Sequence, residues 1–306
     1  MATDFETTSA EEIQERLLTI EGRRRRSAAA YIRYYLGHKP LGTVGFSIVV
    51  LMIALAIFAP LIAPYSYQEQ HYKAVKQAPN FTFFFGTDHF GRDIFSRVVY
   101  GARISMLVGF LSVVVGTGAG AMVGLVSGYF MGKLDHLVQR LVDMWMSFPD
   151  LILALTIVAV FGNTVPNVIM AIAATIFPRG VRIIRSSTIA LREMDYTLAA
   201  RSIGATNVRI IFRHLMPNTV APFLIIMSSM FGTAILTEAG LSFLGLGISE
   251  PTPSWGRMLT GQAAQHMITS PWILLFPGIF ISVTVMGFAF AGDALRDIFD
   301  PKQRGR

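Results

Sequence analysis

Ionisable side chains inside long apolar stretches are the residues of this sequence that could do chemistry, and Asp143, Asp150 and Glu238 hold such positions. At the centre of a bilayer an aspartate costs about 2.5 to 3.5 kcal/mol on insertion scales, so we expect Asp150 to face a wet cavity or a partner side chain. Asp143 could pair with Arg140 or with arginines further along the chain. Asp150 is therefore a candidate for lining a translocation path, and Glu238 and Ser242, at the end of the fifth apolar stretch and in the Gly-rich turn after it, are further candidates. An ion pair or a packed turn would give the same residues a structural role instead.

Motifs that would give the chain an enzymatic activity of its own are missing from the sequence. No Gly-x-x-x-x-Gly-Lys-Ser/Thr loop occurs, and the stretch from Gly128 to Lys133 has the wrong spacing for one. No His-Glu-x-x-His pair occurs, and Gly240 to Gly245 is one residue too long for a nucleophile elbow. The six histidines are scattered and there is no cysteine, which excludes a thiolate metal site. We expect no catalytic residue, no metal ligand set and no cofactor on this chain, and therefore not an enzyme.

The composition favours lipid over water as the surroundings of most of the chain. Hydrophobic residues make up 53% of the 306 residues and charged residues only 15%, against roughly a quarter charged in soluble domains. The net charge of +7 could in isolation suggest a nucleic-acid partner. The Lys and Arg residues lie at the edges of apolar runs, however, so they are better explained as topology signals, and we expect no nucleic acid.

Six stretches are long and apolar enough to cross a membrane, which takes about 20 residues of helix. They are residues 43–63, 105–130, 137–161, 165–184, 219–240 and 272–292. Pro149 and two aspartates interrupt the third stretch, and Pro178 with Arg179 shortens the fourth. The sequence therefore predicts an all-α membrane protein with about six transmembrane helices.

The distribution of Lys and Arg predicts that both termini are cytoplasmic. With this orientation 20 of the 26 basic residues lie on the inside and six on the outside, as the positive-inside rule requires. Four of the six outer charges fall in one loop, residues 64–102, and a fifth, Arg103, follows it directly. Part of this loop could enter the protein, or its basic residues could pair with Asp88 and Asp93.

Small residues recur at every fourth position of the second span, and they form one ridge along a helix. The positions are Ser112, Gly116, Gly120, Gly124 and Gly128. Such a ridge lets another backbone approach closely, which is how helices associate in lipid. We expect this helix to be central to the bundle.

The connection between the fourth and fifth spans is too polar to cross the membrane, yet it has helical spacing. Asp195 is a plausible N-cap and Gly204 a stop signal, which predicts a short helix from Tyr196 to Ile203 facing the cytoplasm. Its small side chains, Ala199 and Ala200, would fit a groove on another protein.

This connection resembles the cytoplasmic signature of the membrane subunits of binding-protein-dependent ABC importers, which runs Glu-Ala-Ala, three residues, Gly, a hydrophobic stretch and Pro. The matching positions are Ala199, Ala200, Gly204 and Pro217, and Leu198 stands where the family usually has Glu. Three further stretches resemble the second permease of the dipeptide, oligopeptide and nickel group. They are Gly86 to Arg97, Glu238 to Gly256, and Gly292 to Lys302.

The resemblance implies a MetI-like type I ABC importer permease fold and a role in importing peptides across a bacterial or archaeal cytoplasmic membrane. It implies a homologous permease subunit, two ABC ATPase subunits that bind ATP and Mg, an extracytoplasmic substrate-binding protein and the lipid bilayer as partners. The coupling helix to the ATPase would comprise Asp195, Tyr196, Ala199, Ala200, Arg201, Gly204 and Ala205. The same architecture could import nickel or another small solute, and an ion-coupled secondary transporter is a further alternative without the inverted repeats that class shows.

The expected division of the chain follows from these spans. Residues 1–42 form a cytoplasmic N-terminal region with a capping box at Ser9 to Glu12 and a basic interfacial helix at residues 28–36. Residues 43–63 are the first transmembrane helix and 64–102 an extracytoplasmic loop. Residues 103–292 form a permease core of five transmembrane helices with a coupling loop at 185–217, and 293–306 form a cytoplasmic tail.

Overall fold

The computed structural model describes residues 40–260, 265 and 267–299. The predicted capping box at Ser9 to Glu12, the basic interfacial helix at 28–36 and the end of the C-terminal tail lie outside the described residues.

Long helices make up most of the described chain, and five of them are apolar enough to cross a membrane. The long elements are α3 (Pro40–Ile57), α5 (Ile94–Phe130), α6 (Gly132–Met146), α7 (Asp150–Phe161), α8 (Val165–Arg192), α12 (Val220–Phe243) and α15 (Trp272–Phe299). Shorter elements are α4 (Ala59–Ile62), the 3₁₀ turn η1 (Tyr72–Ala74), α9 (Asp195–Ser202), α10 (Asn207–Ile210), the π-helical turn η2 (Ile211–Leu215), α11 (Met216–Asn218) and α13 (Trp255–Met258).

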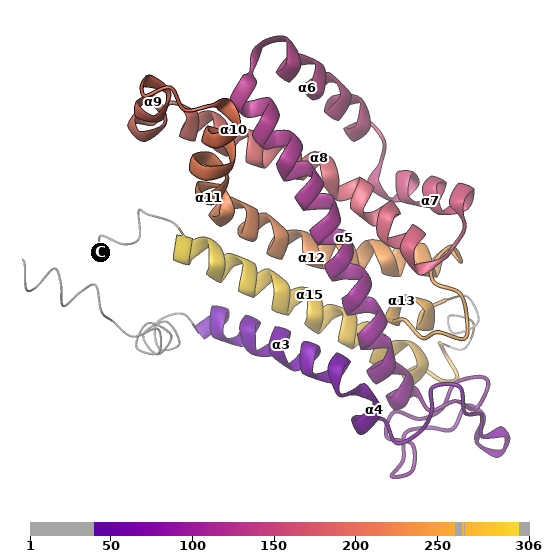
Figure 1. Ribbon diagram of the computed structural model, residues 1–306. Helices are drawn as coiled ribbons and strands as arrows, with labels where there is room; N and C mark the ends of the chain where they lie inside the picture. Colours follow the sequence, from indigo (N-terminus) through magenta and orange to yellow (C-terminus); the bar gives the residue numbers. More distant parts are fainter. Residues whose placement is uncertain (1–39, 261–264, 266, 300–306) are drawn as a thin grey trace, which may run out of the picture.

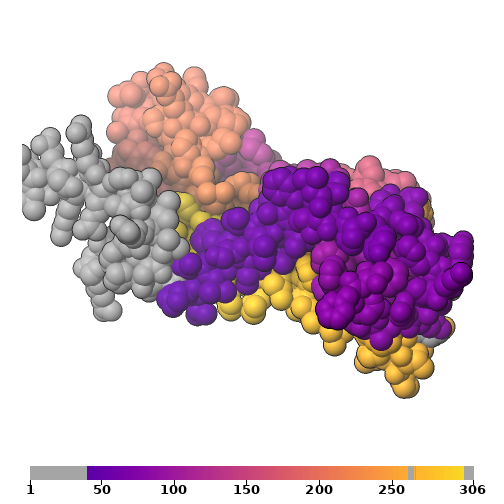
Figure 2. All heavy atoms as spheres, turned by 90° about the horizontal axis from the view of Figure 1, so that it is seen from below, coloured from indigo at the N-terminus to yellow at the C-terminus, as the bar shows by residue number. Residues whose placement is uncertain are grey.

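The two ends of the bundle carry different segments. Figure 1 shows the start of α3, the end of α15 and the short helices α9 and α10 at one end. The segment 63–93, α4 and α13 lie at the other end. Seen from below, α3 lies along the outside of the bundle beside α15, and the segment after α3 packs as a cap over that second end (Figure 2). Because the start of α3 and the end of α15 lie at the same end of the bundle, the chain passes along the bundle an even number of times.

The helix α5 is the centre of the bundle, and its ridge of glycines lies against α8. Asp93 N-caps α5 by accepting a hydrogen bond from the Ser96 amide at 2.8 Å, so the helix begins earlier than the predicted residue 105. A Cβ atom on the ridge glycines would lie closer than 3.0 Å to a carbonyl oxygen of α8. The pairs are Gly116 with Ala173, Gly120 with Phe177, Gly124 with Val181, and Gly128 with Arg185. Ser112, at the head of the ridge, is fully buried.

The third predicted span, residues 137–161, is wrong as a single straight helix. It is divided into α6 and α7, which meet at 86°. The break follows from Pro149, which has no amide hydrogen to donate and disfavours helical backbone at the residue before it. Within the described residues, five helices are long and apolar enough to cross a membrane alone, and the pair α6–α7 can count as a sixth, broken span.

The helix α8 contains the whole of the fourth predicted span, residues 165–184, and continues through Pro178 to Arg192. A proline inside a helix leaves the carbonyl four residues earlier without its hydrogen bond. Here that carbonyl belongs to Ala174, and the indole Nε1 of Trp145 on α6 donates to it at 3.0 Å. A side chain from another helix thus replaces the missing backbone donor.

The core of the bundle lies between α5, α8, α12 and α15, and it continues into α13 through Trp255. This indole is fully buried and its Nε1 donates to the Val98 carbonyl at 2.9 Å. The helix α13 is therefore fixed to the start of α5.

Candidate functional site

The short helix α9 ends in a left-handed turn that sets the direction of the following chain. Gly204 has a φ of +79°, which favours glycine because other residues meet their own Cβ there. The Ala205 amide donates to the Ala200 carbonyl at 3.1 Å and the Gly204 amide to the Arg201 carbonyl at 3.0 Å. This pair of hydrogen bonds is a Schellman motif. Gly204 is therefore the stop that the sequence predicts.

The start of α9 and one of its faces differ from the prediction. Asp195 is the first residue of the helix, Met194 holds the N-cap position, and no side chain of the described residues caps the helix there. Ala200 is only 6% exposed and packs inside this chain, so our expectation that it faces a groove on another protein is wrong. Ala199 is exposed.

The exposed surface of α9 is larger and more apolar than the two alanines alone. Tyr196 and Leu198 are 39% and 41% exposed, and Ile203, directly after the helix, is 85% exposed. Arg201 adds a positive charge on the same short element. Solvent-facing apolar side chains at this density, away from the membrane-spanning helices, indicate a protein contact surface.

The buried side of α9 holds it on the ends of α5 and α8. A small apolar cluster contains Ala200 together with Leu125, Tyr129, Ile184, Ile210, Ile211 and Leu215. The Tyr129 hydroxyl donates to Asn207 Oδ1 at 2.8 Å, and the guanidinium of Arg201 lies 5.9 Å from the Tyr129 ring. Thr197 Oγ1 donates to the Leu191 carbonyl at 2.9 Å. A force on α9 would therefore act directly on the two helices that pack at the centre of the bundle.

Three arginines on α8 hold the broken pair α6–α7. Arg179 pairs with Asp150, Arg182 with Asp143 and Arg185 with Asp135, each at an N–O distance of 2.5 Å. The arginines lie three residues apart, which keeps them on one side of the helix. The pair at Asp135 is bidentate, and Ser127 Oγ donates to the same carboxylate. Asp143 thus pairs with Arg182 on α8, one of the arginines further along the chain, and not with Arg140.

Asp150, one of the translocation-path candidates, is partly accessible as well as paired. Its side chain is 41% exposed and that of Arg179 is 35% exposed. The pair lies at the elbow between α6 and α7, where the chain turns. Both partners are accessible enough to meet a polar solute or a second subunit, so the path assignment stays a prediction.

The other two path candidates, Glu238 and Ser242, lie inside the protein. Glu238 is 1% exposed and accepts hydrogen bonds from the hydroxyls of Ser242, Ser254 and Ser105, at 2.8, 2.8 and 3.4 Å. Ser105 Oγ in turn accepts from the Trp255 amide at 3.1 Å. These contacts tie α5, α12 and α13 together. In this conformation neither Glu238 nor Ser242 can touch a passing solute.

Sequence reasoning missed two features of this site. It allows Asp143 to pair with a later arginine, but it does not anticipate that Arg179, Arg182 and Arg185 lie on one side of a single helix and bind three carboxylates. Trp145 gives no signal in the sequence, because its partner is a backbone carbonyl whose need for a donor follows only from a continuous α8.

Comparison with known proteins adds family information to this geometry. The family model described as the binding-protein-dependent transport system inner membrane component matches residues 120–305. A model of the N-terminal transmembrane domain of oligopeptide transport permease C matches residues 28–79.

Curated relatives cover nearly the whole chain. The dipeptide transport system permease protein DppC of Alkalihalophilus pseudofirmus is 45% identical over 267 residues, which is 86% of either chain. The glutathione transport system permease protein GsiD of Escherichia coli O157:H7 is 42% identical over 84% of this chain and 85% of its own length. Its counterpart from Pectobacterium atrosepticum is 39% identical over 83% and 84%.

A solved structure supports the fold. The methionine ABC transporter MetNI in an inward-facing conformation contains a chain that superposes with a TM-score of 0.54 at 19% identity, over 67% of this chain and 97% of that one. At this identity the likeness concerns the fold alone. The predicted MetI-like permease fold is confirmed.

Proposed function

Because the chain belongs to the family of binding-protein-dependent transport system inner membrane components, we propose that it is the permease subunit of an ABC importer for short peptides. The chain would form half of the translocation path, and a homologous or identical permease the other half. Two ATPase subunits would bind ATP and Mg, and an extracytoplasmic binding protein would deliver the cargo. Both termini and α9 would face the cytoplasm.

The exposed apolar surface of α9, held on α5 and α8 by its buried side, is the observation that carries this proposal. Closure of an ATPase pair would draw two such helices together. The contacts of α9 would transmit this movement to α5 and α8, and rocking of the helix bundles would switch a central cavity between inward and outward access. The partly exposed pair Asp150–Arg179 is the candidate in this chain for contact with the path.

Peptide cargo follows from the relatives and from their chemistry. The named relatives carry dipeptides and glutathione, and both cargoes are short peptides with free carboxylates. Sequence identity of 45% and 42% over more than four-fifths of the chain supports the same class of cargo here.

The coupling role is tested with substitutions on the exposed side of α9. Leu198→Asp and Ile203→Asp place a charge on the contact surface without touching the cluster around Ala200. We expect both variants to insert normally and to lose co-purification of the ATPase subunits, with peptide-stimulated ATP hydrolysis reduced at least about tenfold. A buried charge opposite an apolar groove costs enough for this loss.

Val75→Asp is the matched control, because Val75 is an exposed apolar residue, 45% accessible, at the other end of the bundle. This variant should keep its ATPase subunits. Retention of the ATPases by the Leu198 and Ile203 variants would show that α9 is not the docking element.

A further inference from the structure

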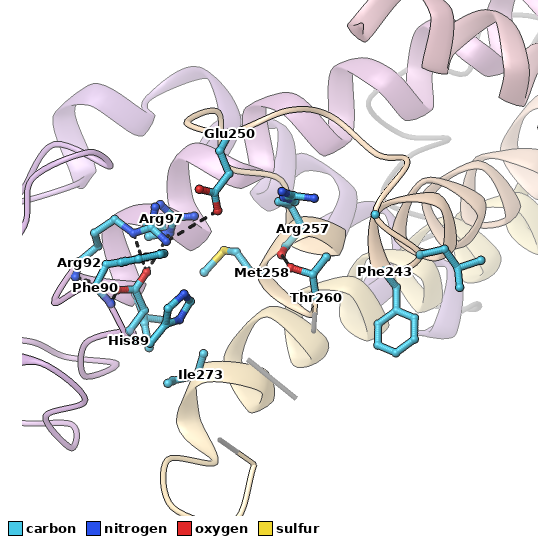
Figure 3. A pocket seen from close by; sticks show the side chains of 14 residues that line it. His89, Phe90, Arg92, Arg97, Phe243, Glu250, Arg257, Met258, Thr260 and Ile273 are labelled. Carbon is cyan, nitrogen blue, oxygen red and sulfur yellow. Dashed lines mark hydrogen bonds and ion pairs between the residues drawn. The ribbon is translucent and has the colours of Figure 1, made fainter. Parts of the chain in front are cut away.

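A polar cavity of about 450 Å³ lies at the end of the bundle opposite α9. Its walls come from the segment before α5, from the start of α5, from the segment after α12 and from the start of α15. Figure 3 shows that Arg92 and Arg97 lie on one side of this cavity, and that Glu250 and Arg257 belong to the segment that follows α12. Pockets for small ligands range over about 300 to 1,000 Å³, so the cavity could take a molecule of dipeptide size.

The charges that line the cavity leave one arginine without a carboxylate partner among the described residues. Asp88 Oδ2 accepts from Arg92 Nε at 2.7 Å and lies 3.8 Å from Arg97 Nε. Glu250 lies 4.0 Å from Arg92. Three guanidinium groups thus face two carboxylates, with His89 as the further titratable group of the lining.

Arg257 is the arginine of this lining that forms no ion pair with a carboxylate within the described part of the chain. Its Nε is buried and has no hydrogen-bond partner there. Its position is nevertheless fixed, because the Arg257 amide donates to Ser254 Oγ at 3.2 Å, and Ser254 is itself bound to Glu238. A buried donor without a partner loses its hydration and gains nothing in return, so a ligand that accepts from it would bind there.

Most of the remaining lining is apolar, and Thr260 adds a hydroxyl that donates to the Arg257 carbonyl at 2.8 Å. Phe243, Met258 and Ile273 form the apolar part of the wall, and Met258 and Ile273 are almost completely buried. The cavity therefore offers one excess positive charge beside a hydrophobic surface. A molecule with a single carboxylate next to an apolar side chain matches this arrangement.

We propose that this cavity receives the C-terminal carboxylate of the incoming peptide, and that the Arg257 guanidinium donates hydrogen bonds to this carboxylate. Guanidinium and carboxylate form charge-assisted, often bidentate hydrogen bonds, which suits a peptide end of any sequence. The apolar wall then takes the last side chain. The inference rests on the proposed function, and it makes the cavity a receiving site on the extracytoplasmic side between the binding protein and the membrane path.

The test uses the complete importer, with its ATPases and binding protein, in proteoliposomes. Uptake of radiolabelled dialanine and ATP hydrolysis are measured at saturating loaded binding protein. Arg257→Gln removes the charge, and Arg257→Lys keeps it. We expect Arg257→Gln to import about tenfold less dialanine per ATP hydrolysed, and Arg257→Lys to recover most of this loss. Lys73→Gln is the matched control, since Lys73 is an exposed cation of the same end of the bundle outside the cavity, and it should import at the wild-type level.

The outcomes separate this inference from the function on which it rests. Wild-type uptake per ATP by Arg257→Gln would overturn the carboxylate site while leaving a peptide importer. A loss that appears instead as weaker affinity for the binding protein, and disappears when that protein is in excess, would also overturn it and assign Arg257 to protein docking. Failure of the wild-type complex to import dialanine would contradict the proposed peptide cargo itself. The assembled complex is checked by co-purification for every variant.

Discussion

Pro178 and Trp145 together explain how one long helix survives a proline in its interior. The proline removes the donor for the Ala174 carbonyl, and the Trp145 indole supplies a replacement at 3.0 Å. The same indole packs near Phe177, with ring centroids 5.7 Å apart. One side chain thus repairs α8 and attaches α6 to it.

A double-mutant cycle isolates this hydrogen bond. Trp145→Phe keeps an aromatic ring beside Phe177 but loses the donor, and we expect it to destabilise the protein by about 1 kcal/mol. In a Pro178→Ala background the new backbone amide at position 178 can donate to the Ala174 carbonyl, so the same Trp145→Phe change should be nearly neutral apart from packing. Thermal unfolding of the four detergent-purified proteins measures the difference. Equal effects of Trp145→Phe in both backgrounds would show that the indole does not compensate for the proline.

Glu238 shows how a residue type can mislead when its environment is unknown. An acidic residue at the end of an apolar stretch suggests a polar path, because burial of a charge in lipid is unfavourable. The structure satisfies its carboxylate with three serine hydroxyls, from α5, from α12 and from the residue before α13. Ser105 and Ser254 are far from Glu238 in sequence, so no local pattern could have announced this arrangement.

At the scale of elements, the pairing of α5 with α8 depends on glycine at each fourth residue of α5. A Cβ on Gly120 would meet the Phe177 carbonyl and the Val181 amide, both closer than 3.0 Å. Backbone atoms in the middle of a helix cannot move aside cheaply, so the two helices would have to separate. This contact is what keeps the movement of one helix tied to the other.

Gly120→Ala and Gly118→Ala form a matched pair on the same helix. Gly120→Ala should destabilise the protein by about 1 to 3 kcal/mol because the helices must separate. Gly118 has nothing within 4 Å of its would-be Cβ, so Gly118→Ala should be neutral or slightly stabilising, since alanine favours helix over glycine. The unfolding midpoints of both variants, measured against the wild type in one detergent, provide the comparison. A midpoint for Gly120→Ala at or above that of Gly118→Ala would contradict the close packing.

The elements that the sequence predicts best are those with a strong period or composition. The apolar runs mark the membrane-crossing helices, and the repeat from Gly116 to Gly128 marks a packing ridge, because each signal is local. The glycine repeat does not predict which helix packs against it. The contacts on α8 are backbone carbonyls, which every residue has, so the sequence of α8 carries no matching signal. Pro149 indicates an interruption of the third span, but the sequence does not give the 86° angle of the break. Its size depends on where α7 packs against α8.

In the polar loop before α5, the sequence likewise predicts only some of the ion pairs. Pairing of its basic residues with Asp88 could be anticipated from sequence, and Asp88 does bind Arg92 and lie near Arg97. Asp93 instead caps α5. Arg257 lies in the same cavity although it is far from this loop in the sequence. This proximity follows only from the tertiary fold.

At the scale of the whole molecule, α8 connects the parts that an importer must coordinate. It packs on the glycine ridge of α5, holds the elbow of α6 and α7 through three arginines, and leads at its end to α9. The cavity around Arg257 lies at the other end of the bundle. If ATPase subunits bind α9 at one end and the binding protein delivers peptide to the cavity at the other, these two ends must face opposite sides of the membrane.

Accessibility of a single cysteine at position 202 tests this requirement most directly. Ser202 is exposed on α9, and the chain has no cysteine of its own, so Ser202→Cys adds one unique thiol. We expect a membrane-impermeant maleimide to leave this thiol unlabelled in intact spheroplasts and to label it in inside-out vesicles stripped of ATPase, with protection when the ATPase subunits are bound. Labelling in intact spheroplasts would place α9 on the outer side and contradict the account of a permease driven from the cytoplasm.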